Sequence, residues 1–260
     1  MLASITPVIL TFNEAPNIER TLAKLAWASD IVVVDSNSSD GTPDLVRTHS
    51  KARLIQRAFD THARQWNFAI GETGIRTPWI LALDADYVLT DALVEELTGL
   101  QPPLHVAGYS ADFEYCIDGN PLRGSVYPPV VVLFRKGSAA YRQDGHTQRL
   151  EVRGDIARLA NRIRHDDRKP MSRWLAAQNA YMALEARKLT TTPSRELPLA
   201  DRIRKTIVLA PVLVFFYALF VRGTILDGRA GLFYAFQRSI AESILSLHLV
   251  RRLIGAARGR

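Results

Sequence analysis

One short apolar run that ends in two carboxylates constrains the fold of this chain more than any other stretch. Residues 79–83 read Trp-Ile-Leu-Ala-Leu, follow Pro78, and lead into Asp84 and Asp86. A brief apolar run bounded by proline is typical of a buried strand. Because residues i and i+2 of a strand share a face, we expect both carboxylates to converge at the end of this strand.

Two interpretations of this acid pair are open. Neighbouring carboxylates repel each other unless a cation lies between them, and Mg²⁺ or Mn²⁺ often joins one or two carboxylates to a substrate phosphate. Alternatively, Asp84 and Asp86 form a polar strand exit that caps the following helix. The other motifs of the sequence decide between these two interpretations.

The first half of the chain alternates strand-like runs with helical patterns. Apolar runs at 5–10, 31–35, 53–56 and 79–84 alternate with helical segments that begin near Asn17, Thr42, Ala63 and Thr90. Asn17 is expected to cap the first of these helices. The alternation predicts an α/β fold, with a mostly parallel Rossmann-like sheet and helices on both faces.

Polar residues follow three of these predicted strands. They are Thr11, Asn13 and Glu14 after the first, Asp35 and Asp40 after the second, and Asp84 and Asp86 after the fourth. In such sheets ligands bind at the carboxyl ends of the strands. No glycine-rich dinucleotide fingerprint or phosphate loop follows the first strand, so a metal is the natural way to neutralise a diphosphate. The pattern indicates a ligand with a nucleobase, a ribose and a bound cation.

These segments together resemble family-2 glycosyltransferases of the GT-A fold. The resemblance rests on Asn13-Glu14, on residues 31–42 and on Asp84-Ala85-Asp86, in this order. Within the family it is strongest to small bacterial enzymes of lipopolysaccharide core synthesis, and it extends through His146, His165 and residues 226–232.

The resemblance implies roles for individual residues. Asp35 would contact the base of a nucleotide-diphosphate sugar, with a UDP-sugar favoured. Asp86, assisted by Asp84, would hold the divalent metal, with His165 as a further metal or diphosphate ligand. Arg64 and Asn67 match a segment that lines the donor site.

The residue that removes the acceptor proton is the main departure from the family pattern. An inverting transferase needs a base at the acceptor hydroxyl. Relatives have His-Glu where this chain has His146-Thr147, and threonine cannot serve as that base. Asp144 is the nearest substitute, with Glu151 and Asp166 behind it, so Asp144 and His146 are the catalytic candidates.

The segment after the acid pair predicts strands without intervening helices. Residues 105–117 form one expected strand with Tyr109, Phe113 and Tyr115 on one face, and residues 130–134 form another. Strands in direct succession suggest a mixed or antiparallel extension of the sheet.

Apolar helices edged by arginine dominate the C-terminal part. Residues 207–221 are almost entirely apolar but fall short of a span, and residues 231–250 are amphipathic. With the net charge of +7, this pattern favours a position at an anionic membrane surface rather than nucleic acid binding. A buried helical pair and a true span by 207–221 are the alternatives.

The expected protein is therefore a peripheral, monotopic enzyme at the cytoplasmic face of the inner membrane. A catalytic domain of residues 1–165 would precede a helical region of residues 166–260. A single cysteine, Cys116, excludes an internal disulfide, and no secretory signal peptide is visible. The acceptor would be lipid-linked. A polyprenyl-phosphate glycosyltransferase of the same fold and a non-catalytic sugar-nucleotide-binding protein are the alternative functions.

Overall fold

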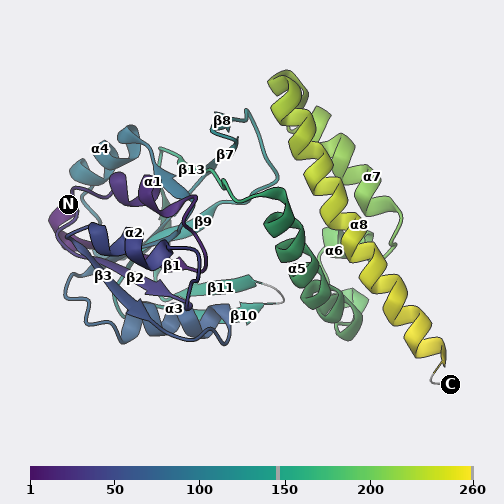
Figure 1. Ribbon diagram of the computed structural model, residues 1–260, viewed down its shortest axis with the longest axis horizontal. Helices are drawn as coiled ribbons and strands as arrows, with labels where there is room; N and C mark the ends of the chain where they lie inside the picture. The colour runs from purple at the N-terminus through teal and green to yellow at the C-terminus, as the bar shows by residue number, and fades with distance from the viewer. Residues whose placement is uncertain (145–146, 259–260) are drawn as a thin grey trace. The chain divides into compact units, whose positions relative to one another are not determined.

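The computed structural model describes residues 1–144 and 147–258. The chain forms two compact units (Figure 1). The first comprises Met1–Pro121 and Tyr127–Lys169, and the second comprises Leu122–Val126 and Pro170–Arg260. The domain boundary after residue 165 stays a prediction.

A seven-stranded sheet in the order β12-β6-β9-β4-β1-β2-β3 forms the centre of the first unit. Its strands are β1 (Ile5–Thr11), β2 (Ile31–Asp35), β3 (Ala52–Gln56), β4 (Trp79–Asp84), β6 (Val106–Ala111), β9 (Val130–Arg135) and β12 (Asp155–Arg158). β1 to β4 are mutually parallel, and β9 runs antiparallel between β4 and β6. The predicted α/β fold with a mixed, mostly parallel sheet is confirmed.

Helices cover both faces of this sheet because each buried strand alternates its side chains between two cores. Ile9 and Val33 pack with α1 (Ile18–Ala23), α2 (Thr42–Thr48) and α4 (Asp91–Gly99). Val8 and Val32 pack on the opposite face with Trp66 of α3 (His62–Gly71). A short 3₁₀ helix, η1 (Leu2–Ser4), precedes β1.

The expectation that Asn17 caps α1 is wrong. Its side chain makes no capping bond and instead donates to Glu14 and Asp167. Asn17 is completely buried, so this long-range hydrogen bonding takes the place of the local cap.

The prediction of a single strand over residues 105–117 is also wrong, because Asp112 separates two strands, β6 and β7 (Phe113–Ile117). β6 stays in the large sheet, whereas β7 joins a second sheet in the order β5-β13-β7-β8. The other strands of that sheet are β5 (Tyr87–Leu89), β8 (Asn120–Pro121) and β13 (Ile163–His165). A separate hairpin consists of β10 (Ala139–Asp144) and β11 (Thr147–Val152).

The second unit is helical. It contains α5 (Met171–Thr191), η2 (Ser194–Glu196), α6 (Leu199–Arg204), α7 (Leu209–Phe216), the π-helical turn η3 (Tyr217–Val221), η4 (Thr224–Asp227) and α8 (Gly228–Arg258). Met182, Leu189, Leu245 and Leu249 form the centre of its core. Arg204 joins three of these helices through Glu185, Asp201 and Glu242, with oxygen to nitrogen distances of 3.0–3.2 Å.

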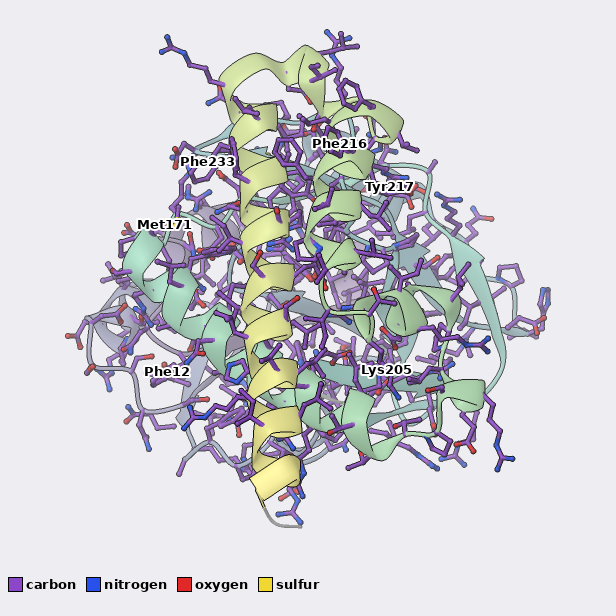
Figure 2. All side chains as sticks on the ribbon, turned by 90° about the vertical axis from the view of Figure 1, so that its right-hand side faces the viewer. Phe12, Met171, Lys205, Phe216, Tyr217 and Phe233 are labelled. Atoms are coloured by element: carbon purple, nitrogen blue, oxygen red, sulfur yellow. The ribbon has the colours of Figure 1, made fainter. Side chains whose placement is uncertain are left out.

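α7 and α8 lie side by side (Figures 1 and 2) and leave apolar side chains exposed. The rings of Phe215 and Phe236 meet between them, with centroids 5.1 Å apart. Within the described residues, no individual helix has the length and apolar character that a membrane crossing requires. The segments Leu209–Val221 and Thr224–Gly255 meet these criteria only together, across a bend of 73°.

Candidate functional site

The carboxyl ends of β1, β2 and β4 place the predicted polar residues at one edge of the sheet. Thr11 is opposite Asp35 in the register of β1 and β2, and Leu10 is opposite Asp84 in that of β1 and β4. The structure therefore brings these strand ends together as expected.

Asp35 holds the loop that follows β2. Its carboxylate is fully buried and accepts hydrogen bonds from the Thr11 hydroxyl at 2.9 Å and from the Ser38 amide at 2.8 Å. The Ser38 hydroxyl also donates to it. Asp35 thus shapes the loop from within, and its predicted contact with a base stays a prediction.

Asn13 and Asp40 tie the loop after β1 to the loop after β2. Asn13 adopts a left-handed backbone with φ of 55° and accepts a hydrogen bond from the Ser39 amide at 2.7 Å. Asp40 accepts from the backbone amides of Ala15 and Thr42. The two loops form one hydrogen-bonded wall beside the strand ends.

Asp86 is the most unusual carboxylate of the site. It is buried, and its Oδ2 lies 3.3 Å from His165 Nε2. Burial disfavours the charged form, but His165 and Lys169 outweigh this and hold the pKa of Asp86 at about 2. Its Oδ1 is buried without a hydrogen-bond partner among the described residues. An ionised carboxylate with an unused buried oxygen is a natural ligand for a cation.

Asp84 lies beside Asp86, and its pKa is raised whereas that of Asp86 is lowered. Burial, and then the negative charge of Asp86, raise the pKa of Asp84 to about 6. One cation between the two acids would offset both the burial of Asp84 and its repulsion by Asp86. Among the described residues, no group of three or more His, Cys, Asp or Glu side chains is arranged to hold a metal. A metal at this site would therefore need part of its coordination from substrate oxygens.

Aromatic rings fix the orientation of His165. The ring centroids of Tyr115 and Tyr127 lie 4.8 and 4.7 Å from that of the imidazole, and Tyr87 lies at 5.3 Å. The pKa of His165 is raised: burial opposes protonation, but Asp86 and Asp84 overcome it. His165 thus contacts Asp86 as a fixed, cation-like neighbour.

A partly buried ion pair completes the site, and the sequence did not reveal it. Lys169 Nζ lies 2.7 Å from Glu14 Oε1 and 3.6 Å from Asp167 Oδ2. Burial lowers the pKa of Lys169, but the negative charges of Asp86 and Glu14 raise it by more. The pKa of Lys169 is therefore raised overall, and the ammonium stays charged. Burial raises the pKa of Glu14 to about 7 despite the opposing effect of Lys169. We call Glu14, Asp84, Asp86, His165 and Lys169 the strand-end cluster.

A sequence signal for Lys169 existed in the spacing after His165. Residues 165, 167 and 169 alternate with residues 164, 166 and 168 along an extended segment, so they point to the same side. His165 contacts Asp86, and Lys169 contacts Glu14, on that side. The strand period alone could have grouped Lys169 with His165.

The two predicted residues of α3 lie in different settings. Arg64 is largely exposed, and its Nη1 lies 3.8 Å from Asp60 Oδ2. Asn67 donates to the Tyr141 carbonyl at 2.9 Å and accepts from the Tyr141 amide at 2.8 Å. Asn67 therefore fastens β10 to α3, and the donor contact expected for both residues stays a prediction.

The hairpin that carries the catalytic candidates packs over Asp84. A cavity of about 60 Å³ is lined by Asp84, Trp66, Tyr141 and Gln148, among others. Asp144 pairs with Thr147 at the end of this hairpin. His146 lies outside the described residues, so its predicted catalytic role, like that of Asp144, stays a prediction.

Comparison with known proteins identifies a family. The model described as "Glycosyl transferase family 2" matches residues 6–147, more than half of the chain. An uncharacterized glycosyltransferase of Rickettsia bellii (strain RML369-C) is 34% identical over 94 residues, which are 36% of this chain and 31% of that protein. The lipopolysaccharide core biosynthesis glycosyltransferase LpsC of Rhizobium meliloti (strain 1021) is 33% identical over 96 residues, 35% of each chain. The matches thus span about a third of the length of these curated relatives.

Solved structures with a similar course of the chain share little sequence. TarS 1–349 of S. aureus in complex with UDP-GlcNAc has a TM-score of 0.49 at 11% identity, over 96% of this chain and 92% of that one. Mannosyl-3-phosphoglycerate synthase from Rubrobacter xylanophilus has a TM-score of 0.45 at 14% identity, over 75% and 79%. Similarities of this size support no conclusion about ligands.

Proposed function

The chain belongs to glycosyl transferase family 2, and we propose that it transfers a sugar from a nucleotide-diphosphate sugar to a lipid-linked acceptor. This proposal rests on Asp86 Oδ1, which is buried and has no hydrogen-bond partner among residues 1–144 and 147–258. It lies beside a second acid at the carboxyl edge of a mostly parallel sheet, where ligands of such folds bind. The product would be a cell-envelope glycolipid, and the partial similarity to LpsC supports a lipopolysaccharide core.

Asp86 and Asp84 would hold a Mg²⁺ or Mn²⁺ ion against the donor diphosphate. The ion would neutralise the charge that grows on the leaving diphosphate. His165 keeps Asp86 ionised and oriented, and Lys169 adds a fixed positive charge beside it. A preorganised charge of this kind lowers the barrier because it needs no rearrangement during the reaction.

The loops after β1 and β2 would bind the nucleoside, with a UDP-sugar as the favoured donor. Asp144, with His146 as the second candidate, would take the proton from the acceptor hydroxyl as it attacks the anomeric carbon. A single in-line displacement inverts the anomeric configuration, so the enzyme would be an inverting transferase.

The donor site can be tested by thermal shift with Mn²⁺ and uridine, guanosine and cytidine diphosphate sugars. A ligand at about 100 times its Kd stabilises the folded state by roughly 2.7 kcal/mol. We expect one nucleotide class to raise the melting temperature in a Mn²⁺-dependent manner. Asp86→Asn should abolish that rise, and Asp91→Asn, an exposed acid of α4, should preserve it. Equal stabilisation of both variants would contradict the proposed site.

The apolar face of α7 and α8 supports a peripheral position at the inner membrane. Phe216 and Phe220 stack with centroids 6.0 Å apart and are more than half exposed. Phe236 and Leu247 continue the apolar surface on α8. Figure 2 labels Phe216 of α7 and Phe233 of α8. Exposed arginines at 222, 229, 251 and 252 would complement an anionic leaflet. We therefore propose the bilayer surface, rather than a second protein, as what covers this face.

Vesicle sedimentation tests this position. Phe220→Ser should weaken binding to anionic vesicles about tenfold, because burying a phenylalanine contributes roughly 1.5–3 kcal/mol. Phe59→Ser is the matched control, since Phe59 is a comparably exposed phenylalanine of the first unit. If the protein instead forms a dimer that Phe220→Ser dissociates, the face binds a second copy and the membrane proposal fails.

A further inference from the structure

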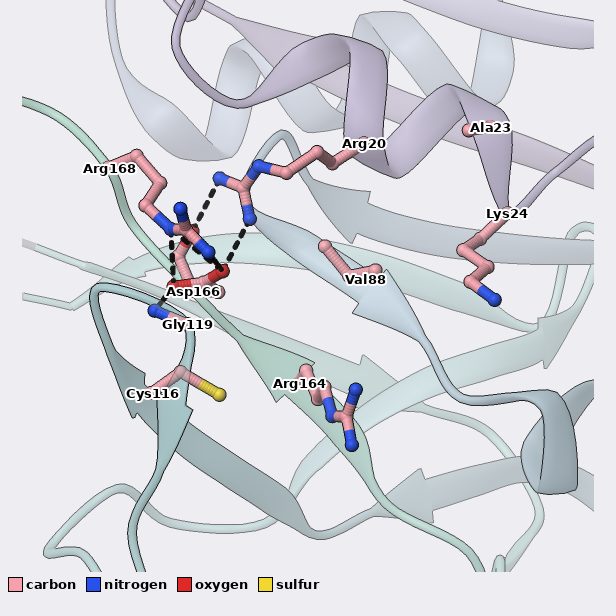
Figure 3. A pocket seen from close by; sticks show the side chains of 9 residues that line it. All are labelled: Arg20, Ala23, Lys24, Val88, Cys116, Gly119, Arg164, Asp166 and Arg168. Atoms are coloured by element: carbon pink, nitrogen blue, oxygen red, sulfur yellow. Dashed lines mark hydrogen bonds and ion pairs between the residues drawn. The ribbon is translucent and has the colours of Figure 1, made fainter.

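A second pocket lies on the other side of the segment that carries His165 and Lys169. It measures about 330 Å³, and its walls come from α1, β5, β7 and residues 164–168 (Figure 3). Arg164, Asp166 and Arg168 face this pocket, whereas His165 and Lys169 face the strand-end cluster. The alternation of an extended chain thus serves two separate surfaces.

Positive side chains dominate the lining of this pocket. Arg20, Lys24, Arg164 and Arg168 line it together with a single acid, Asp166. Arg20 Nη1 lies 2.5 Å from Asp166 Oδ2, and Arg168 Nη2 lies 2.8 Å from the same oxygen. Two guanidinium groups therefore share one carboxylate, as Figure 3 shows, and their combined charge exceeds that of Asp166.

The backbone is built to hold this arrangement. The Gly119 amide donates to Asp166 Oδ1 at 3.0 Å, with Gly119 at φ of +81°. A Cβ atom at this position would lie 2.3 Å from Arg168 Nη2, so any other residue would displace this guanidinium. Asp166 itself is buried. The floor of the pocket is thus an ordered part of the fold rather than a loose group of surface charges.

The other two cations are held only at the rim. Arg164 Nε lies 2.7 Å from Glu114, and Lys24 Nζ lies 2.7 Å from the exposed Asp91. Exposed ion pairs of this kind contribute little stability. A dianion in the pocket can therefore recruit both cations at little cost, and guanidinium groups match the oxygens of a phosphate in geometry as well as charge.

We propose that this pocket binds the phosphomonoester group of a small organic phosphate. A bare phosphate would leave the apolar part of the wall, formed by Ala23, Val88 and Cys116, uncovered. The volume lies in the range of small-molecule sites. No aromatic ring lines the pocket among the described residues, which favours a sugar-sized body over a stacked nucleobase. The proposal does not depend on the proposed transferase activity.

Calorimetric titration of the full chain with glucose 6-phosphate, and with inorganic phosphate alone, tests the site. We expect saturable binding of both, and Arg164→Gln or Lys24→Gln should each weaken it about tenfold. Arg158→Gln is the matched control, because Arg158 pairs with Asp112 at the surface of the neighbouring β12 but does not line the pocket. Thermal unfolding verifies that each variant is folded.

A change of shape without a change of charge gives an independent test. Ala23→Phe fills the pocket and should abolish glucose 6-phosphate binding while inorganic phosphate still binds. Ala26→Phe, an equally exposed position outside the lining, should bind both ligands as the unaltered protein does. Because the phosphate could also belong to a lipid headgroup, vesicles with phosphatidic acid form a second arm. An effect of Arg164→Gln on that arm alone would assign the same phosphate site to a lipid.

Two results would overturn the proposal. Absence of saturable binding on both arms would exclude the site. Equal weakening by Arg158→Gln and Arg164→Gln would show that the anion responds to the general charge of the surface and not to this pocket.

Discussion

Two groups of buried charges, one in each unit of the protein, are completed in different ways. In the second unit, Arg204 contacts Glu185, Asp201 and Glu242 within 3.2 Å. All three carboxylates of this Arg204 cluster contact the same guanidinium, and among the described residues none of its buried side-chain atoms lacks a partner. In the first unit, the strand-end cluster leaves Asp86 Oδ1 and His165 Nδ1 buried with no hydrogen-bond partner in the part of the chain that the structure describes.

This difference separates a structural group of charges from a binding one. The cost of burying a charge is recovered only when each group is paired and hydrogen-bonded. The Arg204 cluster meets that condition within the chain and joins α5, α6 and α8. The strand-end cluster meets it only when something else supplies the missing contacts. A buried acid with a shifted pKa therefore indicates a binding site chiefly where a buried polar atom nearby lacks a hydrogen-bond partner.

Asp86→Asn and Glu185→Gln should show the largest contrast between the two clusters. Asp86→Asn removes the charge but not the shape, so transferase turnover should fall on the order of a thousandfold in a protein that still folds. Glu185→Gln should do the reverse, lowering stability and leaving turnover of the folded protein intact. If Asp86→Asn instead lowers stability and leaves turnover of the folded protein intact, the two clusters have been assigned the wrong way round.

Removal of Arg204 should produce the largest loss of stability. Arg204→Met leaves three acids without their cation inside the helical unit, and breaking a buried ion pair from one side costs about 3–5 kcal/mol. Chemical denaturation followed by circular dichroism measures this loss. Arg187→Met, at an exposed position of α5, is the control and should change stability by less than about 0.5 kcal/mol. A small loss at Arg204 would show that the cluster is solvated.

The sequence predicted the strand ends of the first unit well because their signals are local. Apolar runs such as residues 79–83 bury both faces of a parallel strand, and the two-residue period then placed Asp84 and Asp86 at its end. The resemblance supplied His165, which no local pattern singles out. Asp35 and Asp84 lie at one edge because the parallel pairing of β1, β2 and β4 brings the carboxyl ends of these strands together.

Contacts between distant segments could not be read in the same way. Glu14 and Lys169 are separated by 155 positions, and Asn17 was expected to act locally but bonds to Asp167. The apolar run 207–221 is not one regular helix, since Ile207 has φ of 70° and α7 gives way to a π-helical turn. In each case, tertiary packing outweighs the local preference on which the sequence reading relied.

Glu14 of the strand-end cluster predicts a pH dependence of stability. Burial raises its pKa from 4.5 to about 7, so the folded state holds this proton more tightly than the unfolded chain. Its contribution is therefore fully present below about pH 4.5 and is lost as the pH rises through 7, by roughly 3 kcal/mol. Glu14→Gln should remove this slope from the free energy of unfolding. Glu19→Gln, at an exposed position of α1, should retain it, and a slope equal in both variants would refute the assignment.

The smallest effect concerns how well the open cluster is prepared for its cation. His165→Phe keeps a ring among Tyr87, Tyr115 and Tyr127 but removes the nitrogen that faces Asp86. Loss of a residue that orients a metal ligand typically weakens metal affinity by about 10–100-fold. We expect the Mn²⁺ concentration for half-maximal turnover to rise about tenfold, with the melting temperature nearly unchanged. Phe113→Leu disturbs the same group of rings without touching the nitrogen, and it should leave the Mn²⁺ dependence as it is. Should both variants shift this dependence equally, packing of the rings rather than the His165–Asp86 contact prepares the site.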